Sequence, residues 1–509
     1  MKRAKRLMVC ALAAAMTVGT VGCDCGGVPN SANDVQIYYW NSGYRLDFMQ
    51  EIVDNFNKKQ DTYKVYLEYD SNAATITSTL NLGEDNTYDL YFTSLNNMMY
   101  KSDFIALDDV LELKPEGEEK TIREKYNPQL LNALKNADGT TNFLSYGSGW
   151  CGIVYNADII AKDKVPVTTD ELENLVIELK NDVTPWIFFD TNGSGAGYWS
   201  YPMTAWQVQY DGEEYYYNNL LQLKDENGNA PSKEVLKRKD GRYKALEVAE
   251  QVITHDAVHS ESTNTNHTKV QTLFLQGEAA MMPNGSWLLN ESSESGSATN
   301  FRMMKNPVIS SIVDKCPSIK GEGEDEDEDK GKAADKELSA LIKAIDAGST
   351  ALSGNGYEVS QADYDRVKKA RNLMYNNGAE QYVFIPKYSV AQEGAKEFLR
   401  YFYSDEGLAS FLNHTGCMNS ANFTDSSKLD VSKLSAWGKQ QAEFGTTMTA
   451  ITSPLNKASL FLDTGLDSFL GISYASALSA QNINDRKNVT QLWQSLENKV
   501  EEKWGDWNK

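Results

Sequence analysis

The chain has 509 residues, with 49 lysines and arginines against 71 aspartates and glutamates, which gives a formal net charge of −22. This acidic balance argues against a nucleic-acid partner and against electrostatic adhesion to anionic lipid. A chain of this length exceeds what one hydrophobic core holds, so we expect two or three domains.

The first 22 residues have the layout of an export signal. Four lysines and arginines occur among the first six residues, and residues 7–21 are almost wholly apolar or small. Such a run is too short to be a spanning helix, and no second apolar run of about 18 residues follows it. Cys23 comes directly after Gly22 and resembles the lipobox cysteine of bacterial lipoproteins, although Thr20 replaces the larger aliphatic residue usual there. The resemblance implies a lipid anchor on Cys23 at the outer face of the cell membrane; the alternative is an ordinary signal peptide with a chance cysteine.

The first part of the folded chain reads as the opening of an α/β domain. Residues 23–33 are small and polar, which is typical of a flexible linker, and the fold begins near residue 35. Residues 35–39 predict a strand, and Phe48, Ile52 and Phe56 then recur four apart, as on one face of a helix. Residues 65–69 and 89–92 predict two further strands. Strand, helix, strand and strand in this order predict a parallel sheet.

Strand and helix signals continue to alternate along the rest of the chain. We expect strands at residues 152–155 and 279–282, the second broken by the Pro-Asn-Gly of 283–285. We expect helices at 170–180, 269–276, 391–402 and 489–500, with Gly277 ending the second of them. Residues 320–332 are charged and lack apolar side chains, so we expect them to be solvated.

Metal and disulfide chemistry have little support in the sequence. Cys25, Cys151, Cys316 and Cys417 remain beside Cys23, and four cysteines allow three pairings that sequence cannot separate. His255 and His259 share a helical spacing, but no companion carboxylate motif suggests zinc. A calcium site on Asp325, Asp327 and Asp329 would lack the turn glycine and distal glutamate of an EF-hand. We therefore expect no metal and no cofactor.

Tryptophans beside small polar residues are the main sign of a ligand site. They stand at predicted strand ends or in a glycine-rich stretch at 191–206. Ligands of open α/β sheets bind beyond the carboxyl ends of strands, and an indole matches the C–H face of a sugar while amides match its hydroxyls. For any one tryptophan the alternative is core packing. The predicted ligand-binding residues are Trp40, Asn41, Asn96, Trp150, Trp199 and Trp287.

Three segments resemble bacterial extracellular solute-binding proteins of the carbohydrate-import type, the family that includes maltose-binding protein. Residues 35–56, with YYWNSGYRLDFMQEIVDNF, are similar to the family's first strand, ligand loop and first helix. Residues 274–287, FLQGEAAMMPNGSW, are similar to its pattern of helix, glycine, strand and Gly-Ser-Trp. Residues 385–416 are similar to its return strand and the helix that follows.

The resemblance implies a two-lobed, type II periplasmic-binding-protein-like α/β fold with a hinge between the lobes. It places lobe 1 at 34–145 and 283–390, with an acidic insertion at about 310–380, and lobe 2 at 146–282 and 391–509. It implies a monomeric lipoprotein, not an enzyme, that captures a sugar or oligosaccharide and delivers it to an ABC transporter permease. The alternatives are a surface glycan-binding sensor or adhesin, and a glycoside hydrolase. A hydrolase needs a carboxylate pair or a nucleophile with its base, and no G-x-S-x-G or H-E-x-x-H motif occurs.

Overall fold

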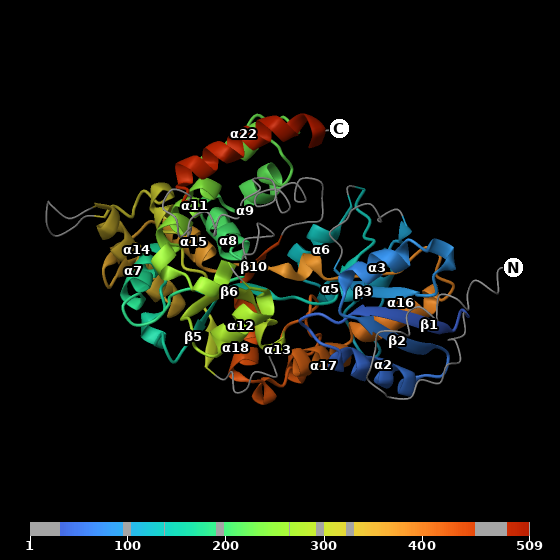
Figure 1. Cartoon of the computed structure of the whole chain (residues 1–509). Coiled ribbons are helices and arrows are strands. Elements are labelled where there is room, and N and C mark those ends of the chain that lie inside the picture. Colours follow the sequence, from blue (N-terminus) through green and yellow to red (C-terminus); the bar gives the residue numbers. More distant parts are fainter. Residues whose placement is uncertain are drawn as a thin grey trace.

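Two lobes lie side by side in the computed structural model of the chain (Figure 1). The structure describes residues 31–94, 103–136, 138–189, 198–263, 265–291, 300–321, 330–452 and 486–507. The predicted signal at 1–22, Cys23, most of the linker, Asn96 and the three aspartates of the candidate calcium site lie outside these ranges. Within the described part of the chain, no helix combines the length and the apolar character needed to cross a membrane.

Lobe 1 is built on a five-stranded sheet in the order β2-β1-β3-β11-β4. Its strands are β1 (Asp34–Trp40), β2 (Lys64–Asp70), β3 (Leu90–Thr93), β4 (Leu144–Ser145) and β11 (Tyr382–Phe384). β1 runs parallel to both β2 and β3, with Ile37 in register with Leu67 and Leu90. β11 runs antiparallel to β3 and β4. The predicted parallel opening of the fold is confirmed.

The helices of lobe 1 pack their apolar faces on this sheet. The longest is α2 (Asp47–Lys59), whose Phe48, Ile52 and Phe56 are buried, as their spacing predicts. The other helices are α3 (Ala73–Leu80), α4 (Asp108–Leu111), α5 (Ile122–Lys125), α6 (Pro128–Leu134), α16 (Gln392–Phe402) and α17 (Asp405–Thr415).

Lobe 2 is built on a sheet in the order β12-β10-β5-β6, with β7 also paired to β5. Its strands are β5 (Trp150–Asn156), β6 (Met281–Gly285), β7 (Phe301–Met303), β10 (Leu373–Asn376) and β12 (Thr449–Ile451), and a small hairpin joins β8 (Ser353–Gly354) to β9 (Tyr357–Glu358). β6 continues through Pro283, where we had predicted a break. The ladder tolerates this proline because β6 is an edge strand, on which a missing N–H leaves no partner unsatisfied.

Helices surround the lobe 2 sheet, and α22 lies across α10 and α11 at one end (Figure 1). They are α7 (Thr169–Leu179), α8 (Ser200–Asp211), α9 (Glu213–Tyr215), α10 (Glu234–Lys237), α11 (Gly241–Val252), α12 (His267–Leu275), α13 (Leu288–Glu291), α14 (Lys330–Asp346), α15 (Gln361–Arg371), α18 (Ala436–Thr447) and α22 (Val489–Trp507). Single-turn helices are η1 (Gly83–Asp85), η3 (Lys162–Lys164), η5 (His255–Ala257), η6 (Ser260–Thr263), η7 (Ser310–Lys315), η8 (Asn377–Glu380), η9 (Ser426–Lys428) and η10 (Val431–Lys433), and η4 (Tyr216–Leu220) is a π-helix.

The second half of the chain divides between the lobes differently from the predicted boundaries. The described residues between 283 and 375, including α14 and α15, pack in the cores of lobe 2, whereas the predicted boundaries place 283–390 in lobe 1. α16 and α17 pack in the core of lobe 1. The reason is aromatic packing against α2: Phe398 lies 5.3 Å from Phe56 and Phe411 lies 4.9 Å from Phe48 between ring centroids. The chain then returns to lobe 2 for α18, β12 and α22.

Three segments cross between the lobes and are hydrogen-bonded to one another. Residues 146–149 join β4 to β5, residues 377–381 join β10 to β11, and residues 416–421 follow α17. The Ser148 N–H donates to the Met418 carbonyl at 3.1 Å. Asn377 and Gly149 bond twice, through their backbones at 3.0 Å and from the Gly149 N–H to Asn377 Oδ1 at 3.0 Å. The three crossing segments therefore form one small hinge that hydrogen bonds hold together.

Candidate functional site

The carboxyl ends of the parallel strands of lobe 1 carry two of the predicted site residues. Trp40 ends β1 and is half-buried, with its indole N–H donating to the Ser71 carbonyl at 3.2 Å. Asn41 follows, also half-buried, and its backbone N–H donates to the Asp70 carbonyl at 2.9 Å. Since β1 and β2 are parallel, these residues share one edge of the sheet, the usual ligand edge of such folds.

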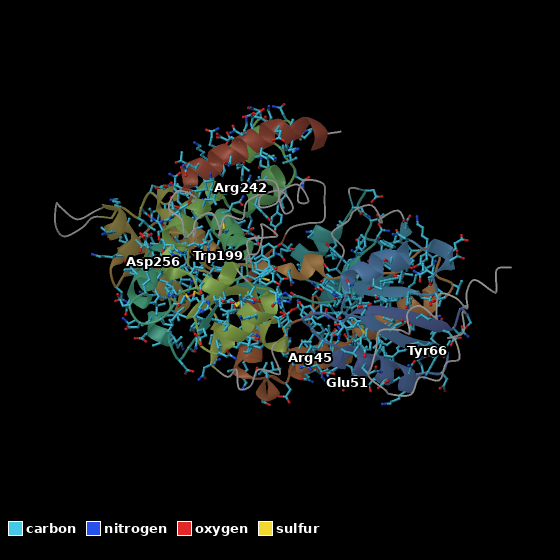
Figure 2. The ribbon with its side chains drawn as sticks, in the orientation of Figure 1. Arg45, Glu51, Tyr66, Trp199, Arg242 and Asp256 are labelled. Carbon is cyan, nitrogen blue, oxygen red and sulfur yellow. The ribbon has the colours of Figure 1, made fainter. Side chains whose placement is uncertain are left out.

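The turn after β1 carries the chain toward lobe 2. The Arg45 N–H donates to the Ser42 carbonyl at 2.9 Å, and the Tyr39 hydroxyl donates to the Arg45 carbonyl at 2.6 Å. Arg45 adopts a left-handed backbone with φ of 63°, which turns the chain sharply into α2. Figure 2 shows Arg45 on the lobe 1 side near the boundary between the lobes. This turn presents Gly43 to lobe 2.

Trp287 is the lobe 2 residue that meets this turn. A Cβ built on Gly43 would lie 2.9 Å from the Cβ of Trp287, and Cβ atoms built on Gly149 and Gly285 would also fall against its ring. Tyr198 and Tyr201 lie edge-on to the indole, with ring centroids 5.8 and 6.3 Å away. Trp287 is 7% exposed and Tyr198 is half-buried. The arrangement is an aromatic cluster at the lobe boundary, made possible by glycines around the indole.

Glu291 adds a carboxylate to this cluster and is not among the residues predicted from the sequence. Glu291 lies one helical turn after Trp287, with its N–H donating to the Trp287 carbonyl at 3.1 Å, and its side chain is exposed. Its Oε2 accepts a hydrogen bond from the Gln271 amide at 2.6 Å. Its Oε1 would lie 3.0 Å from a Cβ on Gly43. The i, i+4 spacing from Trp287 is the signal that could have identified it.

Two of the predicted tryptophans lie in the interior of lobe 2 instead. Trp199 is fully buried, 4.8 Å from Trp186 and 5.9 Å from Phe188 between ring centroids. Figure 2 shows it inside lobe 2. Trp150 is 3% exposed and belongs to a core cluster with Phe274. All three tryptophans belong to hydrophobic cores of lobe 2, and Trp287 is the one that meets lobe 1, at the turn after Trp40 and Asn41.

The cysteines, the possible metal ligands and a second cavity give no better candidate for the ligand site. Cys151, Cys316 and Cys417 are buried. Across the described ranges, no three histidine, cysteine or acidic side chains gather closely enough to hold a metal ion. A cavity of about 770 Å³ lies between α7 and α14, which lie far along lobe 2 from α13 (Figure 1), and it is lined mainly by acidic residues and lysines. It lacks aromatic side chains, so the lobe boundary remains the candidate ligand site.

Comparisons with known proteins agree with this architecture. The model of the family described as bacterial extracellular solute-binding protein matches residues 51–445. A comparison with curated protein sequences finds no match.

Solved structures of solute-binding proteins share the fold over nearly the whole chain. The bacterial solute receptor AcbH, described as having an exclusive preference for β-D-galactopyranose, is 12% identical, with 93% of this chain and 99% of that chain covered and a TM-score of 0.57. RafE in complex with raffinose is 14% identical, with coverages of 92% and 99% and a TM-score of 0.54. Maltose-bound MalE3 of T. maritima is 13% identical, with coverages of 92% and 98% and a TM-score of 0.57. At these identities the likeness establishes the two-lobed fold and does not establish a ligand.

Proposed function

The chain belongs to the bacterial extracellular solute-binding protein family, and from this premise we propose that it captures a sugar or oligosaccharide outside the cell and delivers it to the membrane permease of an ABC importer. The family and the similar solved structures are binding proteins and not enzymes. The protein's task is then to bind, enclose and release one solute, without making or breaking covalent bonds.

The observation that carries this proposal is the aromatic and acidic cluster at the lobe boundary. Trp287, which is largely buried, and the half-buried Tyr198 form the aromatic part, and Glu291 offers a carboxylate acceptor one helical turn away. Trp40 and Asn41 add a half-exposed indole and an amide from the opposite lobe. Flat aromatic surface beside planar hydrogen-bonding groups suits a sugar ring, which has apolar C–H faces and a polar edge. We therefore assign the ligand to Trp40, Asn41, Trp287 and Glu291; Asn96 stays a prediction.

The proposed mechanism is closure of the two lobes on the solute. The three crossing segments tie the lobes at one place, so that small backbone rotations there move the rest of each lobe as a body. A solute that contacts both lobes shifts the equilibrium toward the closed form by its preference for that form. The closed shape is then what the permease recognises.

We propose that the protein stays on the outer face of the cell membrane through a lipid on Cys23. The lipobox resemblance supports this assignment. Replacing Cys23 with serine should release the protein into the culture medium, whereas the unchanged chain should sediment with membranes. If the variant and the unchanged chain partitioned equally between medium and membranes, the lipid anchor on Cys23 would be refuted, and the proposed ligand site would be unaffected.

The ligand class is tested by a thermal-shift screen of the chain from residue 26 onward against D-galactose, D-tagatose, maltose and raffinose, the sugars named for similar structures. A ligand at 100 times its dissociation constant stabilises the folded state by about 2.7 kcal/mol, which raises the melting temperature by a few degrees. A shift with one sugar supports the proposal. Shifts only with peptides or polyamines would replace the ligand class, and release of smaller sugars from a glycan would indicate a hydrolase.

A further inference from the structure

Glu291 has two carboxylate oxygens in different surroundings. Oε2 accepts the Gln271 amide hydrogen at 2.6 Å, whereas Oε1 points to the place where Gly43 of lobe 1 meets lobe 2. The side chain as a whole is exposed. One oxygen is therefore engaged within lobe 2, and the other is directed to the lobe boundary.

Gln271 is built to hold that carboxylate in place. It lies in α12 with only 2% of its side chain exposed, although glutamine is usually a surface residue. The N-terminus of α12 is fixed by Asn266, whose side chain accepts the Lys269 N–H at 3.0 Å. A buried amide on a capped helix gives the exposed carboxylate a fixed orientation, so less side-chain entropy is lost when it binds a further donor.

In the part of the chain that the structure describes, no lysine or arginine forms an ion pair with Glu291, so its carboxylate is available to a donor from a ligand. Desolvation by the protein around the carboxyl raises the pKa of Glu291, more than the Gln271 hydrogen bond and His267 lower it. Although the residue as a whole is exposed, the carboxyl group is partly desolvated, and such a carboxylate gains more from a new hydrogen-bond donor than one in open water.

The side chains of Glu291 and Trp287 lie close together. Side chains four residues apart on a helix have Cβ atoms about 5–6 Å apart, which is comparable with the width of one sugar ring. A ring placed against the cluster of Trp287 and Tyr198 would therefore direct an edge hydroxyl at Oε1 of Glu291.

We infer that Glu291 is the specificity-determining acceptor of the site, and that it selects a sugar unit carrying a free hydroxyl at the ring edge beside Trp287, with Gln271 as the positioning residue. This inference rests on the proposed function. Its ligand class is a neutral sugar with that hydroxyl unmodified, and deoxy or O-methylated forms at that position should be rejected.

The test compares variants by isothermal titration calorimetry with whichever of the four sugars binds the unaltered protein. Glu291→Gln should weaken binding by about 10- to 150-fold, the range for a hydrogen bond to a charged group. Glu278→Gln, at an exposed glutamate just after the same α12, is the matched control and should bind as the unaltered protein does. The melting temperature of each variant shows that it is folded.

A second measurement separates recognition from general damage to the site. The unaltered protein should discriminate against the deoxy form of its sugar at one ring position, and Glu291→Gln should lose that discrimination. Gln271→Met, which keeps the shape but removes the donor, should reduce the discrimination while Glu291 is still present. Unchanged affinity and unchanged discrimination in Glu291→Gln would overturn the inference and leave the proposed function standing. Failure of the unaltered protein to bind any sugar would overturn the proposed function itself.

Discussion

Gly43 of lobe 1 lies directly against Trp287 of lobe 2, so closely that a Cβ on Gly43 would fall 2.9 Å from the Cβ and 3.0 Å from the Cγ of the tryptophan. Protein interiors are close-packed, and carbon atoms do not approach to this distance without displacement. The contact joins a turn in the first lobe to a helix start in the second, and only a residue without a side chain fits there. The relative position of the lobes at this point therefore depends on Gly43.

Replacing Gly43 with alanine should push the lobes apart at the boundary. Overpacking of this kind costs about 1–3 kcal/mol, and if that cost falls on the closed form, the sugar affinity should fall by about 5- to 150-fold. Calorimetry measures the affinity, and small-angle scattering measures the lobe separation. Gly505→Ala is the control, because a Cβ at that position in α22 meets nothing within 4 Å. Unchanged affinity and unchanged scattering in Gly43→Ala would contradict the prediction.

A pair of alanine variants can distinguish the role of Trp287 in binding from the role of Trp199 in stability. Trp287→Ala should abolish sugar binding while the chain stays folded, because its indole is the aromatic side chain at the lobe boundary, and it should also lower the free energy of unfolding, since Trp287 is 7% exposed. Trp199→Ala should lower the free energy of unfolding by about 3–5 kcal/mol and leave the affinity of the folded protein unchanged, since the fully buried Trp199 contacts other aromatics of lobe 2. Urea unfolding and calorimetry report the two quantities. The opposite pattern would exchange the roles that we give to these residues.

Several of the strands and helices could be predicted from the sequence. The alternation in β2 and the four-residue spacing in α2 are local patterns, and the helix predicted at 170–180 is observed as α7 (Thr169–Leu179). The lobe to which a helix belongs was not readable. The apolar face of α16 shows that it must be buried, but only the folded chain shows that Phe398 packs on Phe56 of α2.

In the candidate site, too, local sequence patterns do not show which distant segments come into contact. Trp199 and Trp287 both stand near glycine and serine in the sequence, so their local patterns are alike. Their environments differ because Trp199 meets Trp186 across the interior of lobe 2, whereas Trp287 meets Gly43 across the lobe boundary. Glu291 gains its significance from Gln271, twenty residues earlier in the chain, through a contact between two helices that no local pattern encodes.

A buried ion cluster in lobe 1 should be essential for stability. Lys125 is 1% exposed and pairs with Glu118 and, at 3.0 Å, with Asp405. Burial alone would raise the pKa of Asp405, but the Thr424 N–H and the Lys125 ammonium lower it overall. Lys125→Met would leave Glu118 without its cation and Asp405 with only the exposed Lys428, at 3.5 Å, and should cost about 3–5 kcal/mol in the free energy of unfolding.

Lys396→Met is the control for that variant. Lys396 also pairs with two carboxylates of lobe 1, Asp109 and Glu393, but both of these are exposed, so its loss should cost less than about 1 kcal/mol. Urea unfolding of the two variants measures the difference. Equal losses would mean that burial does not set the energy of the Lys125 cluster. Folding lowers the pKa of Asp405. The stability that its carboxylate contributes should therefore be lost as the pH falls below the ordinary pKa of an aspartate and through the lowered pKa of the folded state.

Asp335 should make the stability of lobe 2 depend on pH in the opposite sense. It lines the cavity between α7 and α14 and is 8% exposed, and its Oδ2 accepts the Thr168 hydroxyl hydrogen at 3.0 Å. Desolvation, with the charges of Asp170 and Glu171 adding to it, raises the pKa of Asp335 to about 6 from an ordinary value of 3.8.

A carboxyl whose pKa is raised on folding binds its proton more tightly in the native state. Between pH 4 and 6 the native state therefore holds more protons than the unfolded state, so this group destabilises the fold progressively as the pH rises. The full cost above pH 6 is about 3 kcal/mol at most, from a shift of roughly two pKa units. Asp335→Asn keeps an acceptor for Thr168 without the charge, so the variant should gain stability over the unaltered protein at pH 7 and lose that advantage at pH 4. Melting temperatures of both proteins across this range measure the effect, with exposed Asp163→Asn as the control. Parallel curves for the unaltered protein and Asp335→Asn would show that Asp335 does not titrate within this range.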